Sequence, residues 1–298
     1  MQDFVAPIVT NSSNIPCFAG GGAYPRNPAA AFVLHSWPWR ETSLIVELLS
    51  VSHGRIAAIA KGARRPHSPV RGLLQPFLPL TIKISGKSDV KTLGKVQSLP
   101  PPLEVPVQHL PAALYANEVT LALVPRGVPD DAIFAAYADC ISELLHRPTA
   151  ELALRRLEKR LLVASGYAPA FDQAADGMIQ PEETYALVEG KGWIATTSSD
   201  RKILSISSIN AHDTDRFSIK GTTLLDIANE KFDSDNSSSL GAGRSATKQV
   251  LHYLMRRIAP QAGSKSRQSW RELSALTHYL PKKTQADDSA GSLAGANI

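Results

Sequence analysis

The amino-acid sequence predicts an α+β protein in which a small β-barrel is followed by a helical domain. Residues 31–99 contain five short apolar or alternating runs, separated by Gly, Pro and Ser-His-Gly turn signals, which is typical of a small all-β domain. After the cluster PPPLEVP at 100–106 the apolar residues recur with helical spacing. The chain has 298 residues, 43% of them hydrophobic, enough for two folded units with sizeable cores.

The predicted strands of the first domain are AFVLHSW from 31, TSLIVELLSV from 42, GRIAAIAKG from 54, LPLTIKIS from 78 and VKTLGKVQSL from 90. In TIKIS, Ile82 and Ile84 alternate with Lys83, which predicts one buried face and one face that carries a cation. Five short strands with a basic face fit an OB-fold. An SH3-like barrel would show nearly the same pattern.

Three helices are predicted next, over 110–124, 131–146 and 151–165. Asp130 is the expected N-cap of the second helix, and Gly166 is expected just past the end of the third. Further helices are predicted at 222–231, 245–258 and 267–279. The runs TYALV and GWIATT around Glu-Gly-Lys-Gly predict a small hairpin inserted in the helical domain.

These patterns divide the chain into four parts. We expect a flexible leader at 1–28 (or a start codon placed too far upstream), an OB-fold domain at 29–103, a helical domain at 104–284 with a mixed insertion at about 168–218, and a disordered tail at 285–298. Prolines at 100–102 mark the boundary, because consecutive prolines cannot sit in a central strand or a helix interior.

The positive charge is concentrated in the barrel. Residues 31–103 contain ten Lys or Arg and three acids, for a net charge of +7, whereas residues 104–298 carry −2. Such an asymmetry favours a polyanion as partner, and nucleic acid is the commonest one inside cells. A basic surface kept only for solubility is the alternative.

Two features of this basic segment are candidates for nucleic-acid contact. The run KGARRPHSPVRG at 61–72 places four cations on a connection between strands, where they could reach phosphates. Trp37 and Trp39 could stack on bases, but a Trp near a strand end is more often a core or interface residue, and we interpret both in that way. Phe77 is also expected in the core.

The sequence contains no recognisable catalytic or metal-binding motif, so we expect neither an enzyme nor a cofactor. GAGRSATK at 241–248 lacks P-loop spacing, DSDNSS at 233–238 lacks the later residues of a calcium loop, and His212, Asp213 and Asp215 are interpreted as a polar surface turn. Cys17 and Cys140 are expected to be reduced thiols, with Cys140 in the core. No apolar stretch approaches the ~18 residues of a membrane-spanning helix, and no secretory signal is recognisable, so we expect a cytoplasmic protein.

Several segments together resemble the bacterial DNA repair and recombination mediator family RecO. They are AFVLHSWPWRETSLIVELLS at 31–50, GRIAAIAKGARRP at 54–66, GLLQPFLPL at 72–80, VKTLGK at 90–95, LYANEVTLALVP at 114–125, ALRRLEKRLLVASGYAPAFD at 153–172 and SKSRQSWREL at 264–273. The resemblance covers roughly residues 29–284, in order.

The resemblance implies an N-terminal OB-fold, a helical domain, binding of single- and double-stranded DNA, and annealing of complementary strands. It implies as partners RecR, in some members RecF, and the acidic C-terminal tail of single-strand binding protein (SSB), with which the family helps load RecA onto SSB-coated DNA. A nucleoid-associated monomer without catalytic activity is expected.

We assign DNA binding to the cations of the barrel and rank the 61–71 loop first. The candidates are Arg40, Arg55, Lys61, Arg64, Arg65, Arg71, Lys83 and Lys91. The family's receptor for the SSB tail lies in the helical domain, and such a tail needs an apolar groove beside cations. Arg155, Arg156, Leu157 and, less strongly, Lys248 are the candidates; the alternative is that the arginines pair with nearby acids such as Glu151 and Glu158.

One departure from the family concerns zinc. Many members carry a four-cysteine zinc module after the G-Y-x-P-x-x-D segment, but here residues 171–185 contain no cysteine. We therefore predict a zinc-free hairpin held by packing. Rival functions are an OB-fold RNA-binding or RNA-chaperone module, an adaptor whose basic face binds an acidic protein, and an enzyme.

Overall fold

We analysed a computed structural model of the chain, which describes residues 28–99, 105–146, 150–188, 190–196, 218–232, 247–248 and 250–255. Several predictions lie outside the described residues: the leader up to residue 27 with Cys17, the prolines at 100–102, the polar turn at 212–215, the segments 233–238 and 241–246, the helix at 267–279 and the tail from 285.

Five strands form a closed barrel in the order β1-β2-β3-β5-β4, so the predicted OB-like barrel is confirmed. Their bounds are β1 Ala29–Trp39, β2 Ser43–Ser50, β3 Gly54–Ala60, β4 Leu80–Ser85 and β5 Val90–Ser98. Neighbouring strands are antiparallel except β3 and β5, whose parallel pairing completes the barrel. Alternate residues fill the interior with small and branched side chains, including Val33, Leu48, Ile56, Leu80 and Ile82.

Three helices follow the barrel, after a short 3-10 turn η1 at Val107–His109: α1 Leu110–Leu123, α2 Asp131–His146 and α3 Glu151–Ala164. Asp130 caps α2 as predicted, because its Oδ1 accepts the N–H groups of Ala132 (2.8 Å) and Ile133 (3.1 Å). Gly166, at φ 70°, ends α3 as predicted. The N–H groups of Gly166 and Tyr167 bond back to the carbonyls of Val163 and Leu162.

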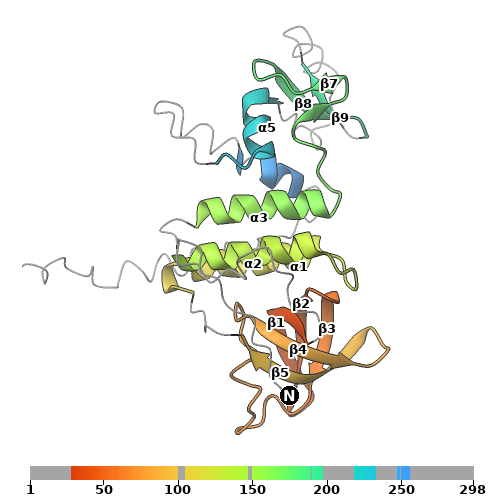
Figure 1. Cartoon of the computed structure of the whole chain (residues 1–298), viewed down its shortest axis with the longest axis vertical. Coiled ribbons are helices and arrows are strands. Elements are labelled where there is room, and N and C mark those ends of the chain that lie inside the picture. Colours follow the sequence, from red (N-terminus) through yellow and green to blue (C-terminus); the bar gives the residue numbers. More distant parts are fainter. Residues whose placement is uncertain are drawn as a thin grey trace, which may run out of the picture.

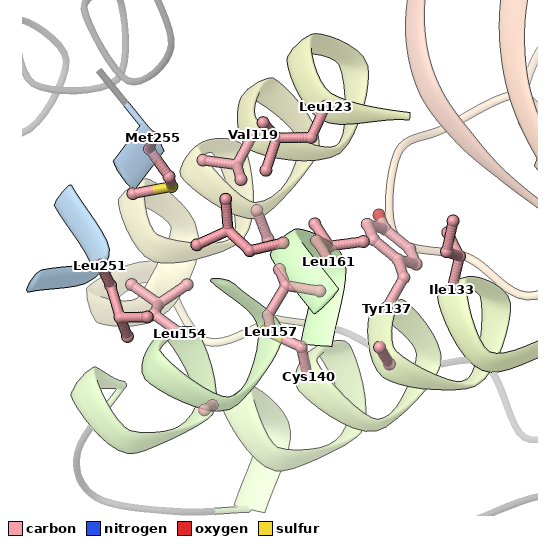
Figure 2. Packing of buried hydrophobic residues seen from close by; sticks show 14 of the residues in the cluster. Val119, Leu123, Ile133, Tyr137, Cys140, Leu154, Leu157, Leu161, Leu251 and Met255 are labelled. Atoms are coloured by element: carbon pink, nitrogen blue, oxygen red, sulfur yellow. The ribbon is translucent and has the colours of Figure 1, made fainter. Parts of the chain in front are cut away.

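The helices pack against each other and against one side of the barrel. Figure 2 shows Leu154, Leu157 and Leu161 of α3 among the side chains of α1 and α2, with Cys140 buried nearby as predicted. Burial and the nearby acids raise the pKa of the Cys140 thiol, which is therefore an inert core group rather than a nucleophile.

The outer face of the barrel and the helices share an apolar core that is distinct from the barrel interior. Phe32 of β1 lies 5.6 Å from the ring of Phe134 and 5.2 Å from that of Tyr137, both on α2. The Tyr137 hydroxyl donates to Asn117 Oδ1 (2.5 Å), and Asn117 Nδ2 donates to the carbonyl of Leu34 in β1 (2.8 Å). This buried chain of hydrogen bonds links α2, α1 and the barrel backbone, and it fixes one face of β1 against the helices.

A glycine allows the closest approach between the two parts. Gly54 begins β3 at φ 64°, and a Cβ there would lie 2.1 Å from the carbonyl oxygen of Val128, in the α1–α2 connection. No other residue type could combine this left-handed turn with this backbone contact.

The mixed insertion forms a second sheet on the far side of the helices. Its order is β10-β8-β9-β6-β7, with β6 Gln173–Ala174, β7 Gly177–Met178, β8 Thr184–Val188, β9 Gly192–Ala195 and β10 Ser218–Lys220. The predicted hairpin is confirmed as the antiparallel pair β8 and β9. Helix α5 (Gly221–Ala228) follows, as predicted, and residues 247–248 and 250–255 are helical. In Figure 1 helices α1 to α3 lie between the barrel and this small sheet.

Candidate nucleic-acid interface

The outer surface of the barrel has a covered side and an open side. Phe32, Leu49 and Val51 belong to the core shared with the helices, so the start of β1 and the end of β2 are covered. The other end of these strands, around the turn at 40–42, carries exposed or half-buried side chains. Any ligand of the barrel must therefore approach this end or the faces that continue from it.

The 61–72 connection is attached to this open end through Arg64. Lys61, Arg64, Arg65 and Arg71 are all exposed, and within the described residues none of them has an ion pair. The N–H of Arg64 donates to the carbonyl of Thr42 (2.9 Å), and its Nη1 donates to the carbonyl of Arg40 (3.2 Å). These two bonds attach the connection to the β1–β2 turn, and so Arg40 and Arg64 lie side by side.

Backbone turns hold the rest of this connection. The N–H of Arg65 bonds to the carbonyl of Gly62 (3.1 Å), Ser68 to Arg65 (3.1 Å) and Arg71 to Ser68 (3.3 Å). Successive turns leave the guanidinium groups outside while the backbone polar groups are satisfied. Lys83, on β4, is also exposed, whereas Lys91 at the start of β5 is half-buried.

Arg55 differs from the other predicted DNA-binding residues because its guanidinium is already engaged. Its Nη1 bonds to Oε1 of Glu47 (3.1 Å), a carboxylate that is only 2% exposed. Burial lowers the pKa of Arg55, and Glu47 opposes that shift. Glu47 also binds Arg126 from the α1–α2 connection, so Arg55 forms part of the contact between barrel and helices.

Three exposed residues of the barrel were not among the predicted site residues. Lys87 lies in the β4–β5 turn and Lys95 on β5, both exposed. Trp39 is 41% exposed, so its interpretation as a core or interface residue is wrong; it lies at the end of β1, past the part that the helices cover. Trp37 is half-buried, and Phe77 is in the core as predicted. The Ser-Gly-Lys-Ser turn at 85–88 was the available signal for Lys87.

The residues predicted to hold the SSB tail are mostly turned inward. Leu157 is 1% exposed and belongs to the helical core. Arg155 is buried, and its Nη1 lies 2.5 Å from Oε2 of Glu158, one of the acids named as the alternative partners. Arg156 pairs with Glu143 of α2 instead (2.5 Å). Lys248 is exposed, and it alone of the four faces open solvent.

Glu158 is the centre of a buried polar group between the helices. Its Oε1 accepts the hydroxyl of Tyr115 (2.6 Å) and lies 3.8 Å from Nε2 of His252. Burial raises the pKa of Glu158, and the nearby Arg155 opposes that shift. These contacts of Glu158 join α1, α3 and the helical residues 250–255, so the role of this buried polar cluster is structural.

The place of the family's zinc module is filled by apolar packing. Phe171 and Trp193 lie with their rings 6.2 Å apart, and both are buried. Within the described residues no group of three or more His, Cys, Asp or Glu could hold a metal ion. In this part of the insertion, the β8–β9 hairpin is packed through buried aromatic rings.

None of the helices that the structure describes has the length and apolar character needed to span a membrane.

Comparison with known proteins agrees with this architecture. The chain matches two family models, "Recombination protein O N terminal" over residues 28–101 and "Recombination protein O C terminal" over residues 108–225. It is 34% identical over 245 residues to DNA repair protein RecO of Ralstonia nicotianae, covering 78% of this chain and 85% of that protein. It is 32% identical over 263 residues to DNA repair protein RecO of Thiobacillus denitrificans, covering 84% of this chain and 93% of that protein.

A shorter match has higher identity: DNA repair protein RecO of Nitrosospira multiformis is 41% identical over 170 residues, covering 56% of this chain and 70% of that protein. The two family models together span the barrel, the three helices and the small sheet. The chain therefore belongs to the RecO family of DNA repair proteins.

Proposed function

We propose that this chain is a recombination mediator without catalytic activity, which binds single- and double-stranded DNA and anneals complementary strands. Together with RecR, and with RecF where it is present, it would help load RecA onto SSB-coated single-stranded DNA. The observation that carries the proposal is the set of exposed cations on the β1–β2 turn and on the 61–72 connection attached to it, namely Arg40, Lys61, Arg64, Arg65 and Arg71.

These cations suit a phosphate backbone better than a specific base sequence. They lie on turns, have no ion pair within the described residues, and can each neutralise a phosphate and release a counterion. Annealing requires two polyanions to approach, and a cationic surface lowers their mutual repulsion. Lys83 and Lys95 would extend this surface over β4 and β5.

The SSB tail is proposed to dock on the helical part of the chain. Lys248 remains the best-placed cation for the acidic tail because it is exposed, whereas Arg155 and Leu157 would need a rearrangement of the core. The proposal also sets the limits of the barrel domain at 29–103 and of the helical domain at 104–284. It further places the protein on the nucleoid.

The test is the rate at which two complementary oligonucleotides, each coated with cognate SSB, anneal in a fluorescence energy transfer assay. It is run with and without this protein, and again with SSB that lacks its C-terminal tail. Acceleration that needs the tail is the expected result. No acceleration at any salt concentration would exclude the mediator function, and a preference for RNA oligonucleotides would favour the RNA-chaperone alternative.

A further inference from the structure

The last part of β1 is an edge of the barrel sheet, because only one of its two sides is paired with a strand, β2, which itself continues the sheet to β3. Strand β4 pairs with β1 only at Ala29, Ala30 and Ala31. From His35 to Trp39, β1 pairs with β2 alone among the described strands. This edge segment, His35 to Trp39, is followed by the turn at Arg40, which has φ 50°.

A β-bulge decides which side chains point outward on this edge segment. The register shifts between Val33 and His35, where Val33 pairs with Leu48 and His35 with Glu47. Val33 lies inside the barrel, whereas His35 is exposed. The extra residue therefore moves the odd-numbered side chains of β1 from the interior to the outer face.

Three aromatic rings consequently follow one another on this outer face. His35, Trp37 and Trp39 alternate along the strand and so share a side, about 6.7 Å apart along the backbone. The rings of His35 and Trp37 are in contact, with centroids 5.6 Å apart. Trp39 at the end of the row is 41% exposed, a large apolar surface for a position next to exposed arginines.

The cations beside Trp39 indicate what kind of ligand would cover it. Arg40 follows it directly, and Arg64 is hydrogen-bonded to the carbonyl of Arg40 (3.2 Å). An exposed indole next to two exposed arginines matches a nucleotide of a single strand, which offers a flat apolar base and an anionic phosphate. An acidic peptide would use the cations but has no flat surface for the ring.

We propose that Trp39, supported by Trp37 and His35, is a stacking platform for an unpaired base of single-stranded DNA, with Arg40 and Arg64 on the adjacent phosphates. The inference rests on the proposed function and deepens it. Bases inside a duplex are stacked on their neighbours and offer no free face, so the platform acts on single strands only. It would hold a strand by one base while the neighbouring bases remain available for pairing.

The experiment measures affinity by fluorescence anisotropy for three labelled ligands: a thymidine 15-mer, an abasic 15-mer of the same phosphate charge, and a duplex. The proteins are the wild-type chain, Trp39→Ala, Trp39→Phe and the control Tyr167→Ala. Tyr167 is an exposed aromatic residue just beyond α3 and outside the barrel. Thermal melting of each variant checks that it is folded.

We expect Trp39→Ala to weaken binding of the thymidine 15-mer on the order of tenfold. Binding of the abasic strand and the duplex should stay within twofold, and Trp39→Phe should retain most of the affinity. The slope of log affinity against log salt concentration should not change, because no phosphate contact is removed. Tyr167→Ala should behave as wild type.

Two results would overturn the platform while leaving DNA binding intact: unchanged affinity of Trp39→Ala for the thymidine 15-mer, or an equal loss for the thymidine and abasic strands. If the wild-type chain binds none of the three ligands, the proposed DNA-binding function itself fails and the platform with it.

Discussion

Arg126 and Glu47 join the two parts of the molecule through a bidentate ion pair, with Nε to Oε1 at 2.8 Å and Nη2 to Oε2 at 2.7 Å. Glu47 lies on β2 of the barrel, and Arg126 lies in the connection between α1 and α2, 79 residues away. Hydrogen bonding to Glu47 raises the pKa of Arg126. The pair lies beside the contact of Gly54 with Val128, so it fixes the barrel at the same junction.

Loss of the Glu47 charge should destabilise this junction. In Glu47→Gln, Arg55 and Arg126 lose their shared carboxylate while Arg55 stays largely buried, its side chain 18% exposed. We expect the free energy of unfolding to fall by about 2 kcal/mol, less than for a fully buried pair because the Arg126 side chain is 54% exposed. Urea denaturation measures the change. Glu41→Gln, on the exposed β1–β2 turn, is the matched control, and equal stability of both variants would contradict the prediction.

The cations of the 61–72 connection should act on phosphates. Arg64→Ala with Arg65→Ala should weaken binding of all single-stranded sequences alike and lower the slope of log affinity against log salt by about 1.4, or about 0.7 for each lost contact. A matched control, Lys191→Ala with Lys220→Ala, removes two exposed charges from the small sheet and should leave affinity unchanged. Unchanged affinity and slope in the arginine variant would exclude this connection as the DNA site.

Arg40 allows binding and stability to be separated, because it has a left-handed backbone at φ 50°. Arg40→Gly and Arg40→Ala both remove the charge and should lose the same affinity for DNA, with the salt slope lowered by about 0.7. Glycine accepts this backbone and alanine does so at a cost, so the glycine variant should be the more stable by about 1 kcal/mol. Isothermal titration and thermal melting measure the two effects. Different affinities for the two variants would mean that the backbone of the turn, rather than the charge, matters for binding.

Glu230 should give the contact between α3 and α5 a pH dependence. Its carboxylate accepts Nε and Nη2 of Arg160 (3.0 and 2.8 Å) and Nζ of Lys159 (3.2 Å), and these hydrogen bonds lower its pKa. A carboxyl group whose pKa is lowered on folding stabilises the protein above its unfolded pKa and loses that effect as the pH falls through the folded pKa.

The variant Glu230→Gln should therefore be less stable than wild type by about 1 kcal/mol at pH 7, and the difference should disappear between about pH 5 and pH 3. Chemical denaturation at several pH values measures this convergence. The exposed Glu182→Gln is the control and should show no such pH dependence. A difference that stays constant with pH would mean that the ion pair does not account for the effect.

The sequence by itself determined the elements of this protein, because each depends on residues close together in the chain. Alternating apolar residues predicted the barrel strands, Asp130 and Gly166 predicted the helix ends, and the concentration of Lys and Arg predicted a basic barrel. These signals need no knowledge of distant contacts.

Only the tertiary structure decided which charged side chains lack an ion pair among the described residues and which aromatic side chains are exposed. Arg55 was predicted to bind DNA, but it bonds to Glu47, and Arg155 lies buried against Glu158. Trp39 was interpreted as a core or interface residue, but the bulge after Val33 and the end of the pairing with β4 leave it exposed. A cation's partner depends on strand register and on helices docked from elsewhere in the chain, and one residue of register turns a side chain from the interior to the solvent.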